Sequence, residues 1–311
     1  MERLFRENPF ILTEAAVVER LRRRDDVLLD ESIIHAALIY DAKGKEALSQ
    51  IYTEYLNLAI NDDIPILLAT PTWRTNQERV NNSNVKSSIN ADAVRYLLAL
   101  RDSHNCSKKN VKIGGIIGCK NDAYKPEEAL STSQAESFHR WQIEELAAGG
   151  AEYLMAVTLP HVGEALGIAK AMEKTQLPYI ISFVIGKDGK VLEGNSLSEA
   201  IKFIDSNTEH RPLAYFVNCS YPSFLINSEL DRVTSERLLG VQANASSLEH
   251  FELDNAAEIQ AESVDEWGDL MLQLKLNYGI KVLGGCCGTN SDHLKYLINE
   301  VKENKEDPEG P

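Results

Sequence analysis

Short apolar runs alternate with longer amphipathic segments along this chain, and the alternation repeats eight times. The short runs are rich in Ile, Val and Leu, which is typical of strands that are buried on both faces. The predicted strands are Val27–Asp30, Pro65–Ala69, Val111–Gly118, Tyr153–Val157, Tyr179–Phe183, Leu213–Val217, Leu238–Ala243 and Lys281–Leu283.

Helical spacing of apolar residues marks the segments between these strands. One example is the set Trp267, Leu270, Met271, Leu274 and Tyr278, and the last helix has Asn290 or Ser291 as its N-cap. Eight strand-then-helix units in one chain predict an α/β protein with a single closed (β/α)8 TIM barrel. We expect the barrel to span residues 1–303, and residues 304–311 to form a flexible tail.

A doubly wound open sheet is the structural alternative to the barrel. That fold usually carries a glycine-rich phosphate-binding turn between a strand and a helix. Gly114 and Gly115 lie inside an apolar run and do not begin a helix, so they do not provide that turn. The pattern therefore favours the barrel.

Composition narrows the function classes. The 311 residues carry a formal charge of -15, which argues against a nucleic-acid-binding surface. No run approaches the roughly 18 apolar residues of a membrane span, and the charged N-terminal segment is unlike a signal peptide. We therefore expect a cytoplasmic protein, and its five cysteines, an odd number, fit reduced thiols. The sequence leaves the oligomeric state open.

Two adjacent cysteines follow the last predicted strand, in the segment Gly284-Gly285-Cys286-Cys287-Gly288-Thr289. Neighbouring side chains in a strand point to opposite faces, so we expect the glycines to turn the backbone and aim both sulfurs to one side. A third cysteine, Cys219, follows the sixth predicted strand. Because active sites of barrels lie at the C-terminal ends of the strands, we expect the three sulfurs to meet at one rim.

Three thiolates around an ion with one open tetrahedral position are typical of a catalytic zinc site. Cys119 follows the third strand and could add a fourth sulfur, although a packing role is expected; Cys106 falls in a predicted surface loop. Such a zinc is a poor Lewis acid but holds an incoming thiol as a nucleophilic thiolate, which indicates alkyl transfer to sulfur. The alternatives are unpaired buried thiols, or a redox barrel with a disulfide between Cys286 and Cys287.

The late Gly-Gly-Cys-Cys-Gly-Thr motif and the earlier Asn218-Cys219 resemble the signature of the homocysteine S-methyltransferase family. The resemblance implies a barrel whose Zn²⁺ ligands are Cys219, Cys286 and Cys287. It also implies that the partners are small molecules: homocysteine, whose thiol is methylated to give methionine, and a methyl donor. The donors favoured are S-methylmethionine and S-adenosylmethionine, with betaine as a further alternative.

The chain departs from the family where the amino-acid substrate is held. The family's Asp-Gly-Gly after the first strand is matched to Asp30-Glu31-Ser32, which implies substrate binding by Asp30. Its Phe-Glu-Thr after the fourth strand corresponds to Ala156-Val157-Thr158, which keeps Thr158 as a substrate-binding candidate but loses the glutamate. Asp30 and Thr158 could instead be turn or cap residues. The lost glutamate leaves two alternatives to homocysteine methylation: another small thiol as acceptor, or a non-catalytic binding or regulatory barrel.

Overall fold

The structure is a computed structural model of the 311-residue chain. It describes residues 1–104, 108–228, 230–249 and 261–306. The predicted surface loop around Cys106 and the last five residues of the predicted tail lie outside the described residues. Helix α13 (Ser291–Glu306) continues three residues into that predicted tail.

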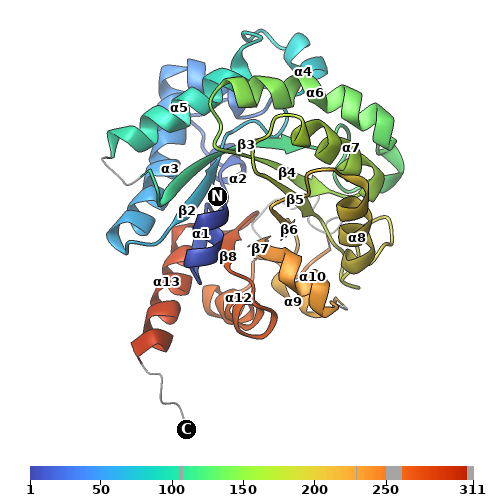
Figure 1. The fold of residues 1–311 in the computed structure, drawn as a ribbon. Helices are drawn as coiled ribbons and strands as arrows, with labels where there is room; N and C mark the ends of the chain where they lie inside the picture. Colours follow the sequence, from blue (N-terminus) through green and yellow to red (C-terminus); the bar gives the residue numbers. More distant parts are fainter. Residues whose placement is uncertain (105–107, 229, 250–260, 307–311) are drawn as a thin grey trace.

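Eight parallel strands within the described residues close into a barrel in sequence order, as the alternating pattern predicts. The barrel closes where β1 pairs with β8, with Ile11 opposite Val282 and Leu12 opposite Leu283. Figure 1 shows the strands as an inner ring and the helices around it. The strands are β1 (Ile11–Thr13), β2 (Ile66–Ala69), β3 (Val111–Gly118), β4 (Tyr153–Leu159), β5 (Tyr179–Phe183), β6 (Ala214–Asn218), β7 (Leu238–Ala243) and β8 (Val282–Gly285).

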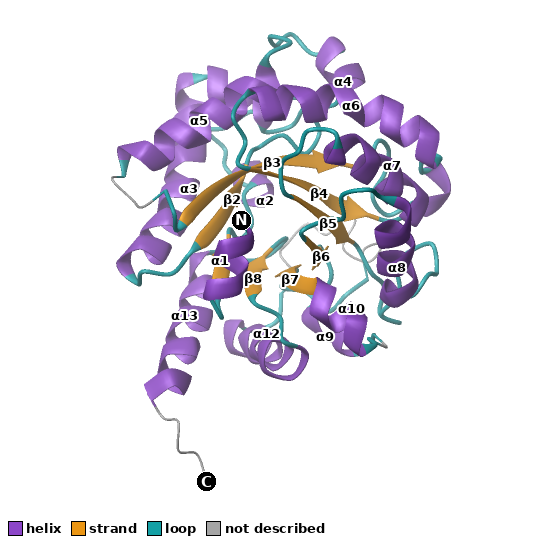
Figure 2. Ribbon diagram, viewed as in Figure 1, coloured by secondary structure: helices purple, strands orange, loops and turns teal. Residues whose placement is uncertain are grey.

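Helices follow the strands and cover the outside of the barrel (Figure 2). Most of them bury one apolar face against the strands, as their helical spacing of apolar residues requires. The α-helices are α1 (Glu2–Glu7), α2 (Val18–Arg22), α3 (Ala42–Asn61), α4 (Gln77–Asn81), α5 (Ile89–Ser103), α6 (Thr132–Ala148), α7 (Val162–Glu173), α8 (Leu197–Asn207), α9 (Pro222–Ile226), α10 (Arg232–Arg237), α12 (Val264–Tyr278) and α13; the 3-10 helices are η1 (Ala36–Tyr40) and η2 (Pro126–Glu128). No helix in the described part of the chain is both long enough and apolar enough to cross a bilayer.

The predicted first strand is wrong. Val27–Asp30 is a loop, and the first barrel strand is Ile11–Thr13, sixteen residues earlier. The apolar run that suggested a strand is not buried, because Leu28 is 91% exposed, whereas Ile11 and Leu12 are fully buried. A strand of three residues gives too short a pattern to be recognised by periodicity.

The barrel interior is apolar at its N-terminal end. Leu4 and Phe5 of α1 pack there against inward-facing residues of the strands, including Ile11, Ile180 and Val282. Figure 1 shows α1 lying over the middle of the barrel at this end. The N-terminal helix therefore closes one end of the barrel, and the opposite, C-terminal end is left for a site.

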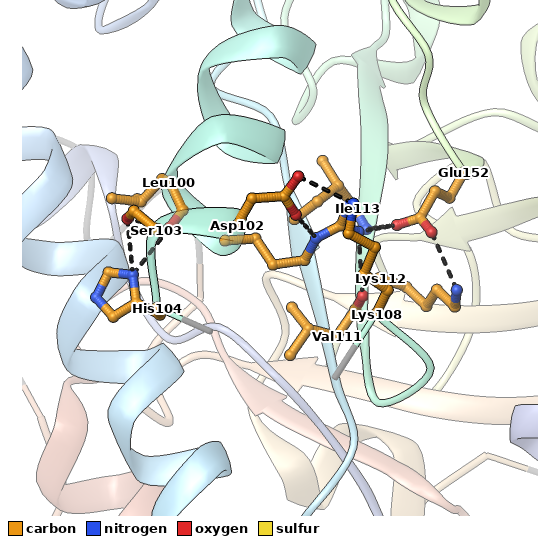
Figure 3. A network of polar contacts seen from close by, with 10 residues as sticks. Leu100, Asp102, Ser103, His104, Lys108, Val111, Lys112, Ile113 and Glu152 are labelled. Carbon is orange, nitrogen blue, oxygen red and sulfur yellow. Dashed lines mark hydrogen bonds and ion pairs between the residues drawn. The ribbon is translucent and has the colours of Figure 1, made fainter. Parts of the chain in front are cut away.

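A carboxylate also ties elements together at the N-terminal end. Glu152, just before β4, accepts hydrogen bonds from Arg101 Nη1 at 2.7 Å, Lys112 Nζ at 3.0 Å and the backbone N–H of Ile113 at 2.9 Å. These contacts connect α5, β3 and β4, and Figure 3 shows Glu152 facing Lys112 and Ile113. Because Arg101 is buried, this group supports the scaffold at the end of the barrel where residues serve stability.

Candidate metal and substrate site

The three predicted sulfurs lie together at the C-terminal rim of the barrel. Cys219 directly follows β6, and Cys286 and Cys287 directly follow β8. Their Sγ atoms all lie within 4.8 Å of one another, and the Sγ atoms of Cys219 and Cys286 are 2.7 Å apart. We call Cys219, Cys286 and Cys287 the sulfur trio. All three are free cysteines, so the predicted disulfide alternative does not describe this structure.

Backbone geometry explains how remote cysteines meet. Cys219 has a φ of 53°, in the left-handed region that non-glycine residues seldom occupy, and this turns its sulfur towards β8. A Cβ on Gly284 would lie 1.8 Å from Thr13 Oγ1, and one on Gly285 would lie 2.0 Å from Thr289 Oγ1. Gly284 and Gly285 are therefore needed for close packing, whereas Gly288, after the cysteine pair, has a φ of 81° and provides the backbone turn that the sequence suggested.

Polar neighbours support a negative charge on Cys219. The pKa of its thiol is lowered well below the ordinary value, chiefly by hydrogen bonds from Cys286 and Cys287, with further help from Thr158 and Asn218. Cys286 and Cys287 act as donors, and their pKa values are raised, that of Cys287 to about 12. These contacts favour a negative charge on Cys219, and a cation that binds all three sulfurs must displace the protons of Cys286 and Cys287.

Asn218 and Thr158 hold this arrangement in place. Asn218 Nδ2 lies 3.3 Å from Cys219 Sγ and donates to Thr158 Oγ1 at 2.8 Å, while the N–H of Thr158 donates to Asn218 Oδ1. Thr158 Oγ1 is 3.7 Å from Cys219 Sγ. Thr158 also has a φ of 55°, which is strained for a β-branched residue. The predicted candidate Thr158 thus lies at the site, beside a sulfur.

Cys119, considered as a fourth ligand, does not join the trio. It is buried after β3, its Sγ contacts the carbonyl of Asn121 at 3.5 Å, and burial raises its pKa to about 12. A neutral buried thiol with its own partner is a packing residue, as the sequence leads us to expect.

The trio forms part of the wall of a cavity of about 570 Å³. Val157, Thr158 and Asn218 line it near the sulfurs, and Glu14 and Thr70 line it on the side of β1 and β2. The volume falls within the range of about 300–1,000 Å³ that is usual for small-molecule sites. A small thiol and a second small reactant can therefore be held next to the sulfurs.

Glu14, and not Asp30, is the acidic residue that directly follows the first strand and lines the cavity. Its carboxylate accepts the backbone N–H of Ala69 at 3.1 Å, and burial raises its pKa to about 8. Asp30 does not line the cavity, and its carboxylate accepts the N–H groups of Ser32 and Ile33 in a local turn. The placement of Asp30 after the first strand is therefore wrong, as a direct result of the misplaced strand.

Val157 lies in the wall of the cavity. Val157 lies in β4, is buried, and lines the cavity. Its side chain belongs to the apolar cluster of the barrel interior. Val157, the residue that the resemblance matches to the family's glutamate, therefore gives the cavity an apolar surface. Glu14 lines the cavity, and Val157 does not add a second carboxylate to it.

Glu14 and Tyr124 are among the residues of the cavity wall that sequence reasoning missed. The sequence pattern did not identify Glu14, because the strand before it is short and no glycine follows Glu14. Tyr124 lies in the loop after β3 and lines the cavity with the sulfur trio. The rule that loops at the C-terminal ends of barrel strands form active sites could have found it, because the third strand was correctly predicted.

The donor set fits a soft divalent ion such as zinc. Thiolates about 2.3 Å from zinc in a tetrahedron lie about 3.8 Å apart, a spacing within the range that the trio already spans. The three sulfurs come from two rigid strand ends, and the cavity is on their open side. Cys219, Cys286 and Cys287 could therefore hold a metal with a further position for a substrate.

Comparisons with known proteins point to one family. The family model for homocysteine S-methyltransferases matches residues 11–301. Homocysteine S-methyltransferase 2 of Arabidopsis thaliana is 30% identical over 176 residues, which are 55% of this chain and 51% of that protein. Homocysteine S-methyltransferase YbgG of Bacillus subtilis is 22% identical over 309 residues, with 93% of each chain covered. The alignments span about half the length of the Arabidopsis relatives.

A solved structure shares the fold. The metallated form of the homocysteine methyltransferase MmuM from Escherichia coli superposes with a TM-score of 0.73, covers 96% of this chain and 98% of its own, and is 16% identical. The family match extends from β1 to the end of the barrel and includes all three cysteines. The chain therefore belongs to the homocysteine S-methyltransferase family.

Proposed function

We propose that this protein is a methyltransferase that moves a methyl group to the thiol of homocysteine, with zinc held by Cys219, Cys286 and Cys287. The observation that carries the proposal is the gathering of three sulfurs from β6 and β8 in the wall of a substrate-sized cavity. Zinc bound there would hold the acceptor sulfur as a thiolate at neutral pH, without a separate base.

The reaction follows from this arrangement. The acceptor thiolate attacks the methyl carbon of the donor in line, a new C–S bond forms, and the old bond from that methyl group breaks. If the donor is a sulfonium such as S-methylmethionine or S-adenosylmethionine, it leaves as a neutral thioether and no acid is required. The apolar surface of Val157 and the limited size of the cavity favour this charge-neutralising step, because they keep water away from the nucleophile.

Chain residues position the acceptor. We propose that Glu14 receives the ammonium group of homocysteine, because its carboxylate faces the cavity and has one backbone donor. Thr158 and Asn218 orient Cys219 and so fix where the acceptor sulfur is held. Asp30 takes no part in this proposal, because its side chain is occupied in a turn outside the cavity wall. The trio needs reduced thiols, which supports a cytoplasmic location.

A direct assay tests the proposal. Purified protein loaded with zinc is incubated with homocysteine and each of S-methylmethionine, S-adenosylmethionine and betaine, and methionine is measured. We expect methionine from at least one sulfonium donor and its loss after treatment with a chelator. Absence of methionine with every donor, in protein that holds one equivalent of zinc, would contradict methyl transfer to homocysteine.

Val157 supports one alternative, a zinc-binding barrel that binds a thiol but does not transfer a methyl group, or that uses another small thiol. The alternative predicts that zinc is retained while homocysteine binds weakly, since Val157 cannot pair with an ammonium group. Calorimetric titration of the zinc-loaded protein with homocysteine, and then with thiols that lack an amino group, distinguishes the two.

A further inference from the structure

Tyr124 lies on the cavity side of the sulfur trio and has no role in the function described above. It lines the same cavity as Cys219, Cys286 and Cys287. Although 41% of the residue is exposed, its hydroxyl hydrogen-bonds with Cys219. The hydroxyl therefore occupies space directly in front of the sulfurs.

The backbone that carries Tyr124 is firmly attached at both ends of its loop. Glu164, buried in α7, accepts the N–H of Lys120 at 2.8 Å and the N–H of Leu130 at 3.2 Å. The same carboxylate pairs with His139 Nε2 of α6 at 3.0 Å. One buried carboxylate thus ties the start and the end of the loop to the outer helices, which disfavours opening of the whole loop.

The turn around Tyr124 is also held locally. Its own N–H donates to Asp122 Oδ1 at 3.0 Å, and the N–H of Lys125 donates to the carbonyl of Asp122 at 3.3 Å. The residue as a whole, in contrast, is partly exposed to solvent. Movement at this position is therefore expected from the side chain, and not from the backbone.

We propose that Tyr124 is a gate residue for the acceptor: its hydroxyl covers the sulfur trio in the substrate-free protein, and its ring rotates towards solvent when a thiol enters. This inference rests on the proposed function, because the thiol that enters is the methyl acceptor. A thiol that enters through the cavity and approaches Cys219 must displace the hydroxyl and its hydrogen bond to Cys219. Acceptor affinity is therefore reduced by the free energy of that contact.

The first test compares Tyr124→Phe with the wild type. Both proteins are loaded with Co²⁺ in place of zinc, and the visible absorption of the metal is followed during titration with homocysteine. Loss of the hydroxyl removes one hydrogen bond that must be broken, so we expect about 3- to 10-fold tighter binding in the variant. Equal dissociation constants in the two proteins would overturn the proposal.

Tyr40→Phe is the matched control. Tyr40 is also 41% exposed, and its hydroxyl donates to Asp92 at 2.7 Å, away from the residues that line the cavity. The control should bind homocysteine as the wild type does. A tighter complex in Tyr40→Phe as well would show a general effect of losing a tyrosine hydroxyl and would overturn the assignment to Tyr124.

A second test does not require the acceptor to be known. The reduced, metal-free protein is treated with iodoacetamide, and the alkylation rate of Cys219 is measured by peptide mass analysis. We expect Tyr124→Ala to be alkylated several-fold faster than the wild type, with Tyr124→Phe between them and both variants folded by circular dichroism. Unchanged rates would overturn the gate. Faster alkylation with no binding of homocysteine would support the position of Tyr124 and count against the proposed acceptor.

Discussion

Two sides of the cavity differ in how much the sequence reveals about them. The sulfur side, at the ends of β6 and β8, carries three cysteines, a rare residue in this chain, and two of them lie between close-packed glycines. The acid side, at the end of β1, carries Glu14, one of 47 acidic residues, directly after a strand of three residues. A rare residue type with a strict packing requirement can be found by motif, whereas a common type can be found only by its position in the fold.

The two sides also differ in their electrostatics. On the sulfur side, hydrogen bonds lower the pKa of Cys219 and prepare a negative charge. On the acid side, burial raises the pKa of Glu14 to about 8 and keeps its carboxyl largely neutral until a cation arrives. The sulfur side is therefore ready for a metal, and the acid side is ready for a group that brings its own positive charge.

The largest expected effect tests the sulfur side. Cys219→Ser should lose its bound zinc, and methyl transfer should fall at least about 1,000-fold, since the metal supplies several kcal/mol by forming the thiolate. Zinc content by atomic emission and the turnover number measure this. Cys119→Ser is the control, because Cys119 is buried outside the trio, and it should keep one zinc per chain. Full zinc retention in Cys219→Ser would refute the assignment of this ligand.

The second prediction concerns the pH dependence of stability on the acid side. The pKa of Glu14 rises from an ordinary value of 4.5 to about 8 in the fold, so the native state binds more protons than the unfolded state between these values. Stability therefore falls as pH rises through this window. Glu14→Gln, which cannot ionise, should avoid this loss and gain about 3 kcal/mol relative to the wild type between pH 5 and pH 9.

Urea unfolding of both proteins at pH 5, 7 and 9 measures this difference. The difference in the free energy of unfolding between Glu14→Gln and the wild type should grow as the pH rises to about 8 and should stay constant above that pH. A constant difference between the two proteins at all three values would show that Glu14 titrates normally, and the acid side would then resemble an exposed carboxylate.

The third prediction concerns the cavity wall at Val157, where the change to glutamate adds a carboxylate. Val157→Glu should tighten homocysteine binding about tenfold, because a charge-assisted hydrogen bond to an ammonium group is worth about 1.5–3 kcal/mol and burial offsets part of it. Titration calorimetry measures the change. Val157→Gln, of similar shape, should show a smaller gain, and a thiol without an amino group should bind no better to Val157→Glu. Equal gains for both thiols would exclude ammonium recognition here.

The smallest effect is expected at Asp30. Its carboxylate accepts two backbone N–H groups in a turn, so Asp30→Ala should cost about 1 kcal/mol of stability and leave acceptor affinity unchanged. Thermal unfolding and the Michaelis constant for homocysteine are the measurements. A large rise in the Michaelis constant would restore Asp30 to the substrate site and would overturn the assignment of Glu14 to the acid side.

Strands two to eight were predicted within a few residues because each is a continuous apolar run, buried on both faces between the barrel interior and the helices. The first strand was missed because Ile11–Thr13 is shorter than a pattern can show, and because Val27–Asp30 imitates a strand while Leu28 faces solvent. The misplaced strand also affected the predicted site, because Asp30 was chosen as a substrate-binding residue only for its position after that strand.

The amino-acid sequence by itself determined the barrel and its three sulfurs. Buried strands require apolar runs, and two adjacent cysteines among glycines have few structural uses other than a soft-metal site. Only the tertiary structure decided that Glu14 and Val157 line the same cavity as the sulfurs, and that Tyr124 hydrogen-bonds with Cys219. These facts depend on which strand ends meet at one rim and on which way each side chain points, and local sequence pattern does not encode contacts between segments so far apart along the chain.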